Sequence, residues 1–280
     1  MESDKFREAL IEHFSDFQKA IASDDGDWTV KGFIDIYKNI YTISVDTKVV
    51  SKIMELMLFP LIMQFAAKHN YRVVLSEHQN HYPDITFVAE DETKIALDVK
   101  STYRTDSDKV SGFTLGAFTG YFRDRTSTKN CTYPYGAYAA HFVLGVIYSR
   151  SKEVTDERKV YTLDDLSNIV SVVSNFTFLL QEKWRIASAL PGSGNTKNIG
   201  SIHDINDLIE GKGPFVPLGE KVFDHYWMNY LTDEMARRID SVIPYHNLDT
   251  YQKWLKMDLT PASPVLKQDE GVQGALDLDA

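Results

Sequence analysis

Apolar side chains recur along this chain with two different periods, and these periods predict where helices and strands lie. In residues 4–21 and 47–68 they recur every three to four positions, which predicts two amphipathic helices. Asp46 is placed to cap the second helix, and Pro60 should kink or interrupt it. Residues 220–256 also have a helical, aromatic-rich pattern. We therefore expect helices in both halves of the chain.

Strand patterns fill most of the remaining sequence. β-Branched and aromatic residues dominate 28–44, and shorter strands are predicted at 71–76, 84–89 and 94–101. The turn sequence EDET joins the last two, so they should form a hairpin. Three further predictions complete the pattern: a small-residue helix passing into a buried strand over 133–148, a strand in 175–187 and a loop over 191–201.

The composition is that of an ordinary soluble globular chain. Its 280 residues are 43% apolar and 25% charged, enough for one large domain or two small ones. There is neither a run of 18 apolar residues nor a basic start leading into an apolar run, so no membrane span and no secretory signal are expected. The single cysteine, Cys131, fits a reducing cytoplasm and should be a small buried hydrophobe.

Charge changes this picture in two places. The net charge of −10 argues against a protein that coats DNA through bulk positive charge, although basic residues can still line a cleft. Residues 261–280 contain four acids, one lysine, two prolines and two glycines, and we expect this acidic tail to be disordered.

The segment that carries chemistry is HYPDITFVAEDETKIALDVK, residues 81–100. Side chains alternate between the faces of a strand, so Asp98 and Lys100 point away from the core-facing Ile, Leu and Val beside them. Asp84 shares the corresponding face of the preceding strand with Thr86. Pairing of the two strands should therefore bring Asp84, Asp98 and Lys100 together on one non-core face.

Two carboxylates and an ammonium suit phosphodiester hydrolysis. Mg²⁺ takes oxygen ligands, usually one or two carboxylates together with waters and phosphate oxygens. Asp84 and Asp98 supply such oxygens, and Lys100 can hold the attacking water or stabilise charge on the phosphate. The alternative interpretation is a solvated hairpin face with ordinary charges. Glu55, on the polar side of the 47–68 helix, is by itself most simply a solvated helix charge.

Many segments, in the same order along the chain, resemble the EcoRV-like family of type II restriction endonucleases, which have a PD…(D/E)xK active site. The matching segments are SVDTKVVSKIMELMLFP (44–60), HQNHYPDITF (78–87), KIALDVKSTY (94–103), FTLGAFTGYFR (113–123), PGSGNTKNIGSIH (191–203), EGKGPF (210–215) and FDHYWMNY (223–230). The resemblance therefore spans roughly residues 44–230.

This resemblance implies an α/β (α+β) fold with a central mixed β-sheet flanked by helices, in one endonuclease domain over residues 1–260. It implies a homodimer that cleaves a short palindrome in double-stranded DNA with Mg²⁺, leaving 5′-phosphate and 3′-hydroxyl ends. Residues 28–44 are a possible dimerisation segment. The retained loop suggests the palindrome GATATC with a blunt cut. A prokaryotic cytoplasm and a companion DNA methyltransferase are implied as well.

The resemblance also assigns roles to individual residues. Asp84 and Asp98 would be metal ligands, Lys100 the catalytic lysine and Glu55 an additional acidic residue of the site. Residues 191–203 would form the DNA recognition loop. The residues implied to contact DNA are Gly192, Gly194, Asn195 and Thr196 in the major groove, Gln79 and Asn80 in the minor groove, and Lys48 and Thr102 near the backbone.

Some features depart from the family, and other functions stay open. Residues 123–130 are longer than their counterpart, and alignment is poor after residue 231, where Arg237 and Arg238 are only candidates for phosphate contacts. The GSGN sequence lacks the G-K-[ST] of a P-loop, so no nucleotide cofactor is expected. The alternatives are a repair or junction nuclease of the same active-site class and a non-catalytic DNA-binding protein.

Overall fold

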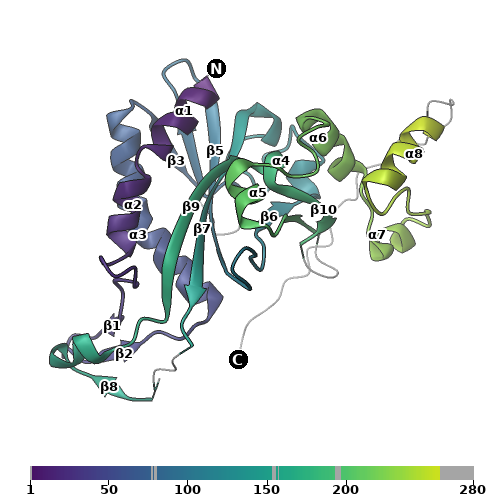
Figure 1. Cartoon of the computed structure of the whole chain (residues 1–280). Coiled ribbons are helices and arrows are strands. Elements are labelled where there is room, and N and C mark those ends of the chain that lie inside the picture. Colours follow the sequence, from purple (N-terminus) through teal and green to yellow (C-terminus); the bar gives the residue numbers. More distant parts are fainter. Residues whose placement is uncertain are drawn as a thin grey trace.

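A five-stranded mixed sheet forms the centre of the protein (Figure 1). The structure is a computed structural model, and it describes residues 2–76, 78, 81–152, 156, 158–192 and 197–258. The strands lie in the order β3, β4, β5, β7, β9, and only β5 and β7 are parallel. Their bounds are Arg72–Leu75 (β3), Ile85–Val88 (β4), Lys94–Tyr103 (β5), Tyr138–Arg150 (β7) and Val173–Glu182 (β9). The predicted mixed sheet and the β4–β5 hairpin are confirmed.

Three helices cover one face of this sheet: α1 (Glu2–Ile11), α2 (Phe14–Ile21) and α3 (Thr47–Lys68). The prediction of one helix over 4–21 was wrong, because the helix is interrupted at His13. The His13 ring bonds the Ala9 carbonyl oxygen at 2.9 Å, and the His13 backbone N–H donates instead to Leu10. A side chain that takes a backbone carbonyl in this way competes with the helical hydrogen bond.

The long helix α3 begins as predicted and continues through Pro60. The Asp46 carboxylate accepts hydrogen bonds from the backbone N–H groups of Lys48 and Val49, at 2.9 and 3.1 Å. The predicted interruption at Pro60 is not observed, since the helix runs on to Lys68. By length and composition alone α3 is apolar enough to cross a membrane, but its buried ridge packs into the core beneath the central sheet. That position is typical of a core helix.

A second layer, rich in tyrosine and tryptophan, covers the other face. It contains a three-stranded sheet in the order β10, β11, β6 and several short helices. The bounds are Thr114–Ala117 (β6), Ala187–Pro191 (β10), Asn198–Ser201 (β11), Gly120–Phe122 (η1), Tyr135–Ala137 (η2), Lys183–Ile186 (α4), Ile205–Glu210 (α5), Glu220–Asn229 (α6), Asp233–Arg238 (α7) and Leu248–Asp258 (α8). The helical pattern predicted over 220–256 is thus confirmed as three separate helices.

Two predictions for this second layer were wrong. The small-residue helix expected at the start of 133–148 is only the single turn η2, because β7 begins at Tyr138 and takes the following small residues into the central sheet. The loop expected over 191–201 contains strand β11, which pairs with both β10 and β6. The glycines of this segment made it look like a loop, but one of them is required by the strand pairing. A Cβ on Gly200 would lie 2.7 Å from the Cα of Gly192, so only glycine lets the two segments approach this closely.

A small outlying sheet extends away from the central sheet, at the lower left of Figure 1. It consists of β1 (Gly32–Ile34), β2 (Ile40–Thr42) and β8 (Val160–Tyr161), and η3 (Leu163–Asn168) follows β8. Strand material was predicted within 28–44, and β1 and β2 confirm it as a hairpin. Several of its large apolar side chains are exposed, which contrasts with the two buried cores.

Candidate active site

The β4–β5 hairpin places Asp84 directly opposite Asp98. Ile85 pairs with Leu97, so the residues one step outward, Asp84 and Asp98, face each other across the strands. The Asp84 backbone N–H donates to Asp98 Oδ1 at 3.2 Å, and the Val99 N–H donates to Asp84 Oδ2 at 2.9 Å. Each carboxylate is therefore fixed by the backbone beside the other. The expectation that the two acids lie together agrees with this geometry.

Lys100 completes the group from the same face of β5. Its Nζ lies 3.1 Å from Asp84 Oδ2 and 3.5 Å from Asp98 Oδ2. The Asp98 side chain is 5% exposed, whereas Lys100 and Asp84 are 27% and 32% exposed. Solvent therefore reaches this acidic pair past Asp84 and Lys100.

The electrostatics of this group follow from its burial. Burial, followed by the nearby Asp98 charge, raises the pKa of Asp84, although Lys100 and the Val99 N–H act in the opposite direction. Burial alone lowers the pKa of Lys100, but Asp98 and Asp84 outweigh it, so that this pKa lies above its ordinary value. Lys100 is thus held as an ammonium, and its single positive charge balances only one of the two carboxylates.

Most of the face that carries these residues belongs to a core, and this corrects the sequence prediction of a non-core face. Asp84 and Lys100 keep partial access to solvent, but Thr86, expected to share their non-core face, is fully buried, and its hydroxyl hydrogen-bonds that of Tyr138 at 2.9 Å. The second layer covers this side of the hairpin, and Tyr82 stacks on Tyr121 beside it with ring centroids 5.2 Å apart. Strand alternation identified which side chains share a face, but it did not reveal the second layer above them.

This acid pair has the donor chemistry for a hard divalent cation. Within the described residues, His, Cys, Asp and Glu side chains nowhere gather in threes with the geometry of a metal site. The protein therefore offers two carboxylates at this point, and Mg²⁺ commonly binds through one or two carboxylates and completes its shell with water and phosphate oxygens. Asp84 and Asp98 fit such an ion.

Glu55 lies apart from this acid pair in the described contacts. It forms an exposed ion pair with Lys52 at 2.8 Å, and the two side chains are 39% and 53% exposed. The preceding turn of α3 touches β5, because Ser51 Oγ and Ser101 Oγ are 2.6 Å apart. Helix α3 is therefore docked near the active-site strand, but the structure does not bring Glu55 into a three-acid cluster.

The residues expected to contact DNA differ in how the structure places them. Lys48 is exposed in the first turn of α3, and Gly192 is exposed at the end of β10. Thr102 lies on β5 itself and is only 4% exposed, which leaves little of it for a DNA phosphate to contact. The other expected contacts lie outside the described residues: Gln79, Asn80, Gly194, Asn195 and Thr196.

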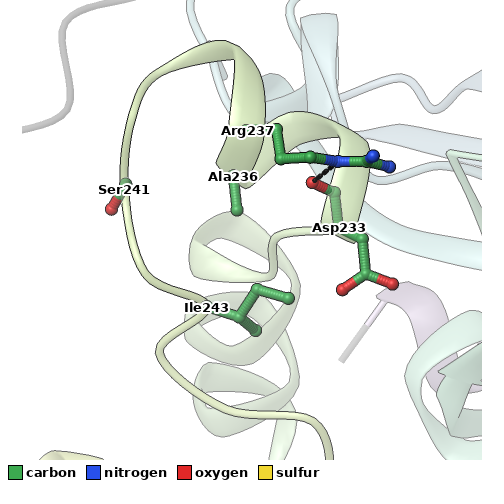
Figure 2. A pocket seen from close by; sticks show the side chains of 5 residues that line it. All are labelled: Asp233, Ala236, Arg237, Ser241 and Ile243. Carbon is green, nitrogen blue, oxygen red and sulfur yellow. Dashed lines mark hydrogen bonds between the residues drawn. The ribbon is translucent and has the colours of Figure 1, made fainter.

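Arg237, a candidate for phosphate contacts, lines a separate open pocket of about 450 Å³ on the C-terminal helices (Figure 2). Its Nε donates to the Asp233 carbonyl oxygen at 3.2 Å, and its neighbour Arg238 pairs with Glu234. Because both Asp233 and Arg237 line it, this pocket has mixed charge.

Sequence reasoning missed one buried charge near the acid pair. Lys183 begins α4 and is 1% exposed, and its Nζ lies 4.3 Å from the centre of the Tyr82 ring. Its local sequence gave no signal, because a lysine after a strand is most often a surface residue.

Three comparisons bear on this chain. The sequence model of the family described as "Restriction endonuclease EcoRV" matches residues 24–256. A curated protein of Escherichia coli, "Type II restriction enzyme EcoRV", is 38% identical over 244 residues, which cover 86% of this chain and 96% of that protein. Among solved structures, "NlaIV restriction endonuclease" matches with a TM-score of 0.40 and 13% identity, over 88% of this chain and 95% of that chain.

Proposed function

This chain belongs to the EcoRV family of type II restriction endonucleases, and from that premise we propose that it hydrolyses double-stranded DNA at a short palindrome with Mg²⁺. The products would carry 5′-phosphate and 3′-hydroxyl ends. The observation that supports this most directly is the placement of Lys100 Nζ within 3.5 Å of both Asp84 and Asp98.

Each residue of this group has a distinct task in the proposed reaction. Asp84 and Asp98 would hold Mg²⁺, which supplies Lewis acidity and a water of lowered pKa when it is bound. Lys100, kept as an ammonium by the two acids, would orient the attacking water or stabilise charge developing on the phosphate. The backbone hydrogen bonds to both carboxylates keep them in place before DNA arrives. Glu55 would act from α3, and its contribution should be smaller.

The target sequence is proposed to be GATATC, cut at its centre to leave blunt ends. The support is the retained GSGNT sequence over 192–196, which offers glycines for close backbone approach, Asn195 for adenine and Thr196 for a thymine methyl group. Gln79 and Asn80 would contribute from the minor groove, and Lys48 from the DNA backbone.

We further propose that two copies of this chain act together. A palindrome is twofold symmetric, so a twofold-symmetric dimer can read both half-sites with one recognition loop from each chain. The outlying sheet supports this, because Ile34, Ile36 and Tyr37 are 59%, 87% and 78% exposed. Such an apolar patch is typical of a protein interface. A methyltransferase would protect the host genome, and a prokaryotic cytoplasm is the expected location.

One cleavage experiment tests the proposed reaction. Wild type, Lys100→Ala and the control Lys52→Ala are incubated with a plasmid of known sequence, in Mg²⁺ and in EDTA. We expect discrete fragments that end at GATATC from wild type and from Lys52→Ala in Mg²⁺, and none from Lys100→Ala or in EDTA.

The other outcomes distinguish the alternatives. Cleavage of branched or supercoiled DNA with no fixed end sequence would favour a repair or junction nuclease. Binding of the duplex without any cleavage in Mg²⁺ would favour a non-catalytic DNA-binding protein. Full activity of Lys100→Ala would remove Lys100 from the reaction.

A further inference from the structure

A second lysine is buried against the ring of Tyr82, two residues before Asp84, in the aromatic layer on the other face of the central sheet. Lys183 directly follows β9, and its Nζ lies 4.3 Å from the centre of the Tyr82 ring and 5.2 Å from that of Tyr135. Nζ donates a hydrogen bond to the Tyr135 hydroxyl at 3.5 Å. A Cβ on Gly116 would lie 3.3 Å from the Tyr121 hydroxyl and 3.6 Å from Lys183 Nζ, so the cation and this phenol share one small space.

This cation is buried without a partner acid in direct contact. Lys183 is 1% exposed, and the ion pairs between described residues do not include it. Burial lowers the pKa of Lys183 to about 8, and the Asp98 charge is the largest influence in the opposite direction. A buried ammonium without a contacting counter-ion costs free energy that an apolar residue would not cost. The charge of Lys183 must therefore have a role of its own.

The charges around the acid pair indicate that role. Asp84 and Asp98 together carry two negative charges, and Lys100 balances one of them. The charges of Lys183 and Asp98 attract each other, and with Lys183 counted the four residues carry zero net charge. Removing the charge of Lys183 would leave a net negative site, which attracts a divalent cation more strongly.

On the basis of the proposed function, we propose that Lys183 is a positioning residue of the cleavage site, whose buried charge weakens binding of the divalent ion until a DNA phosphate is present. In the free protein the four residues would then hold a divalent ion only weakly. A phosphate beside Asp84 and Asp98 would add negative charge and oxygen ligands, so the ion would bind more tightly there. Lys183 would thus couple metal binding to DNA binding.

Direct metal binding tests this without any cleavage. Mn²⁺, which also takes oxygen ligands, is titrated into the full-length protein without DNA, and the free ion is measured by electron paramagnetic resonance. Lys183→Met should bind Mn²⁺ roughly tenfold more tightly than wild type, because a nearby positive charge is removed. Lys183→Arg should stay close to wild type. Lys94→Met is the matched control, since Lys94 also lies over a tyrosine ring, at 5.2 Å from Tyr133.

The sign of the change separates this role from a structural one. Loss of packing would weaken metal binding, so a folded Lys183→Met that binds Mn²⁺ equally or more weakly overturns the proposal. Lys183→Gln gives a second neutral variant; unfolding of both neutral variants with a folded Lys183→Arg would show a structural role and also overturn it. If Asp98→Asn leaves Mn²⁺ binding unchanged in both backgrounds, the proposed function fails, and the role of Lys183 fails with it.

Discussion

Replacing Lys100 with methionine should destabilise the metal-free protein, and a divalent ion should restore much of the loss. Methionine keeps most of the volume of the side chain and removes its charge. Asp84 and Asp98 would then face each other with no cation within 3.5 Å, and Asp98 has almost no access to solvent. Two carboxylates in such a site cannot both stay ionised without cost.

The size of this effect can be worked from the distances. At 3.1 and 3.5 Å each attraction is about 5 kcal/mol at an effective dielectric constant of about 20. Desolvation of the ammonium offsets most of this sum, and breaking a buried ion pair by removing one partner costs about 3–5 kcal/mol. Lys100 and Asp84 retain 27% and 32% of their exposure, so we expect about 2–3 kcal/mol after allowance for solvent screening.

Urea unfolding measures this loss as a difference in the free energy of unfolding. Wild type and Lys100→Met are compared in EDTA and in Mg²⁺, with Lys52→Met as the control. Lys52 forms a shorter ion pair, 2.8 Å from Glu55, but both side chains are exposed, so its loss should cost only about 0–1 kcal/mol. Mg²⁺ should stabilise Lys100→Met more than wild type, because the ion replaces the missing positive charge.

Two results would refute this reasoning. Equal losses for Lys100→Met and Lys52→Met in EDTA would show that burial does not strengthen the pair around Lys100. Equal stabilisation of wild type and Lys100→Met by Mg²⁺ would show that the ion does not bind where the ammonium was lost.

Four further predictions follow from other parts of the molecule. Glu55→Gln should change the Mg²⁺ concentration for half-maximal cleavage less than Asp84→Asn does, since Glu55 pairs with an exposed lysine. Ile36→Lys should shift the protein from dimer to monomer in light scattering, because Ile36 is 87% exposed in the turn that joins β1 and β2. Gly211→Ala should lower the free energy of unfolding by about 1–3 kcal/mol, because Gly211 has φ +66° and a Cβ would lie 2.6 Å from Gln181 Oε1. Burial holds the pKa of His141 well below its ordinary value. Folding with a neutral His141 is therefore favoured fully above about pH 6.5, and this contribution to stability is lost as the pH falls. In His141→Asn the free energy of unfolding in urea should depend less on pH between about 6.5 and 5.

The hairpin of the active site could be predicted from sequence because its residues are close neighbours along the chain. Strand alternation and one turn were enough to place Asp84, Asp98 and Lys100 on a common face, and the register of β4 and β5 agrees with this. Nothing beyond the local pattern was needed, since antiparallel pairing across a short turn leaves few alternatives.

Predictions that depend on distant parts of the chain could not be made in the same way. Thr86 was expected on a face away from the core, but Tyr138 of β7 packs against it and buries it. Lys183 follows the end of β9, and no local sequence pattern indicates that this lysine is buried against tyrosine rings from other parts of the chain. The break at His13 depends on one side chain that takes a backbone carbonyl, which the apolar period does not record.

The overall net charge of −10 is a poor guide to how this protein meets DNA, and the structure explains why. Electrostatic attraction at a site depends on charges within about a Debye length, roughly 8–10 Å in physiological salt, and not on the sum over the whole chain. At the acid pair, Lys100 already cancels one carboxylate, and in our proposal Lys183 cancels the other. A neutral site does not repel a phosphate, and it gains net positive charge once a divalent ion is bound. Attraction to the scissile phosphate would therefore depend on the metal, so DNA affinity should rise with Mn²⁺ or Mg²⁺ far more in wild type than in Asp98→Asn.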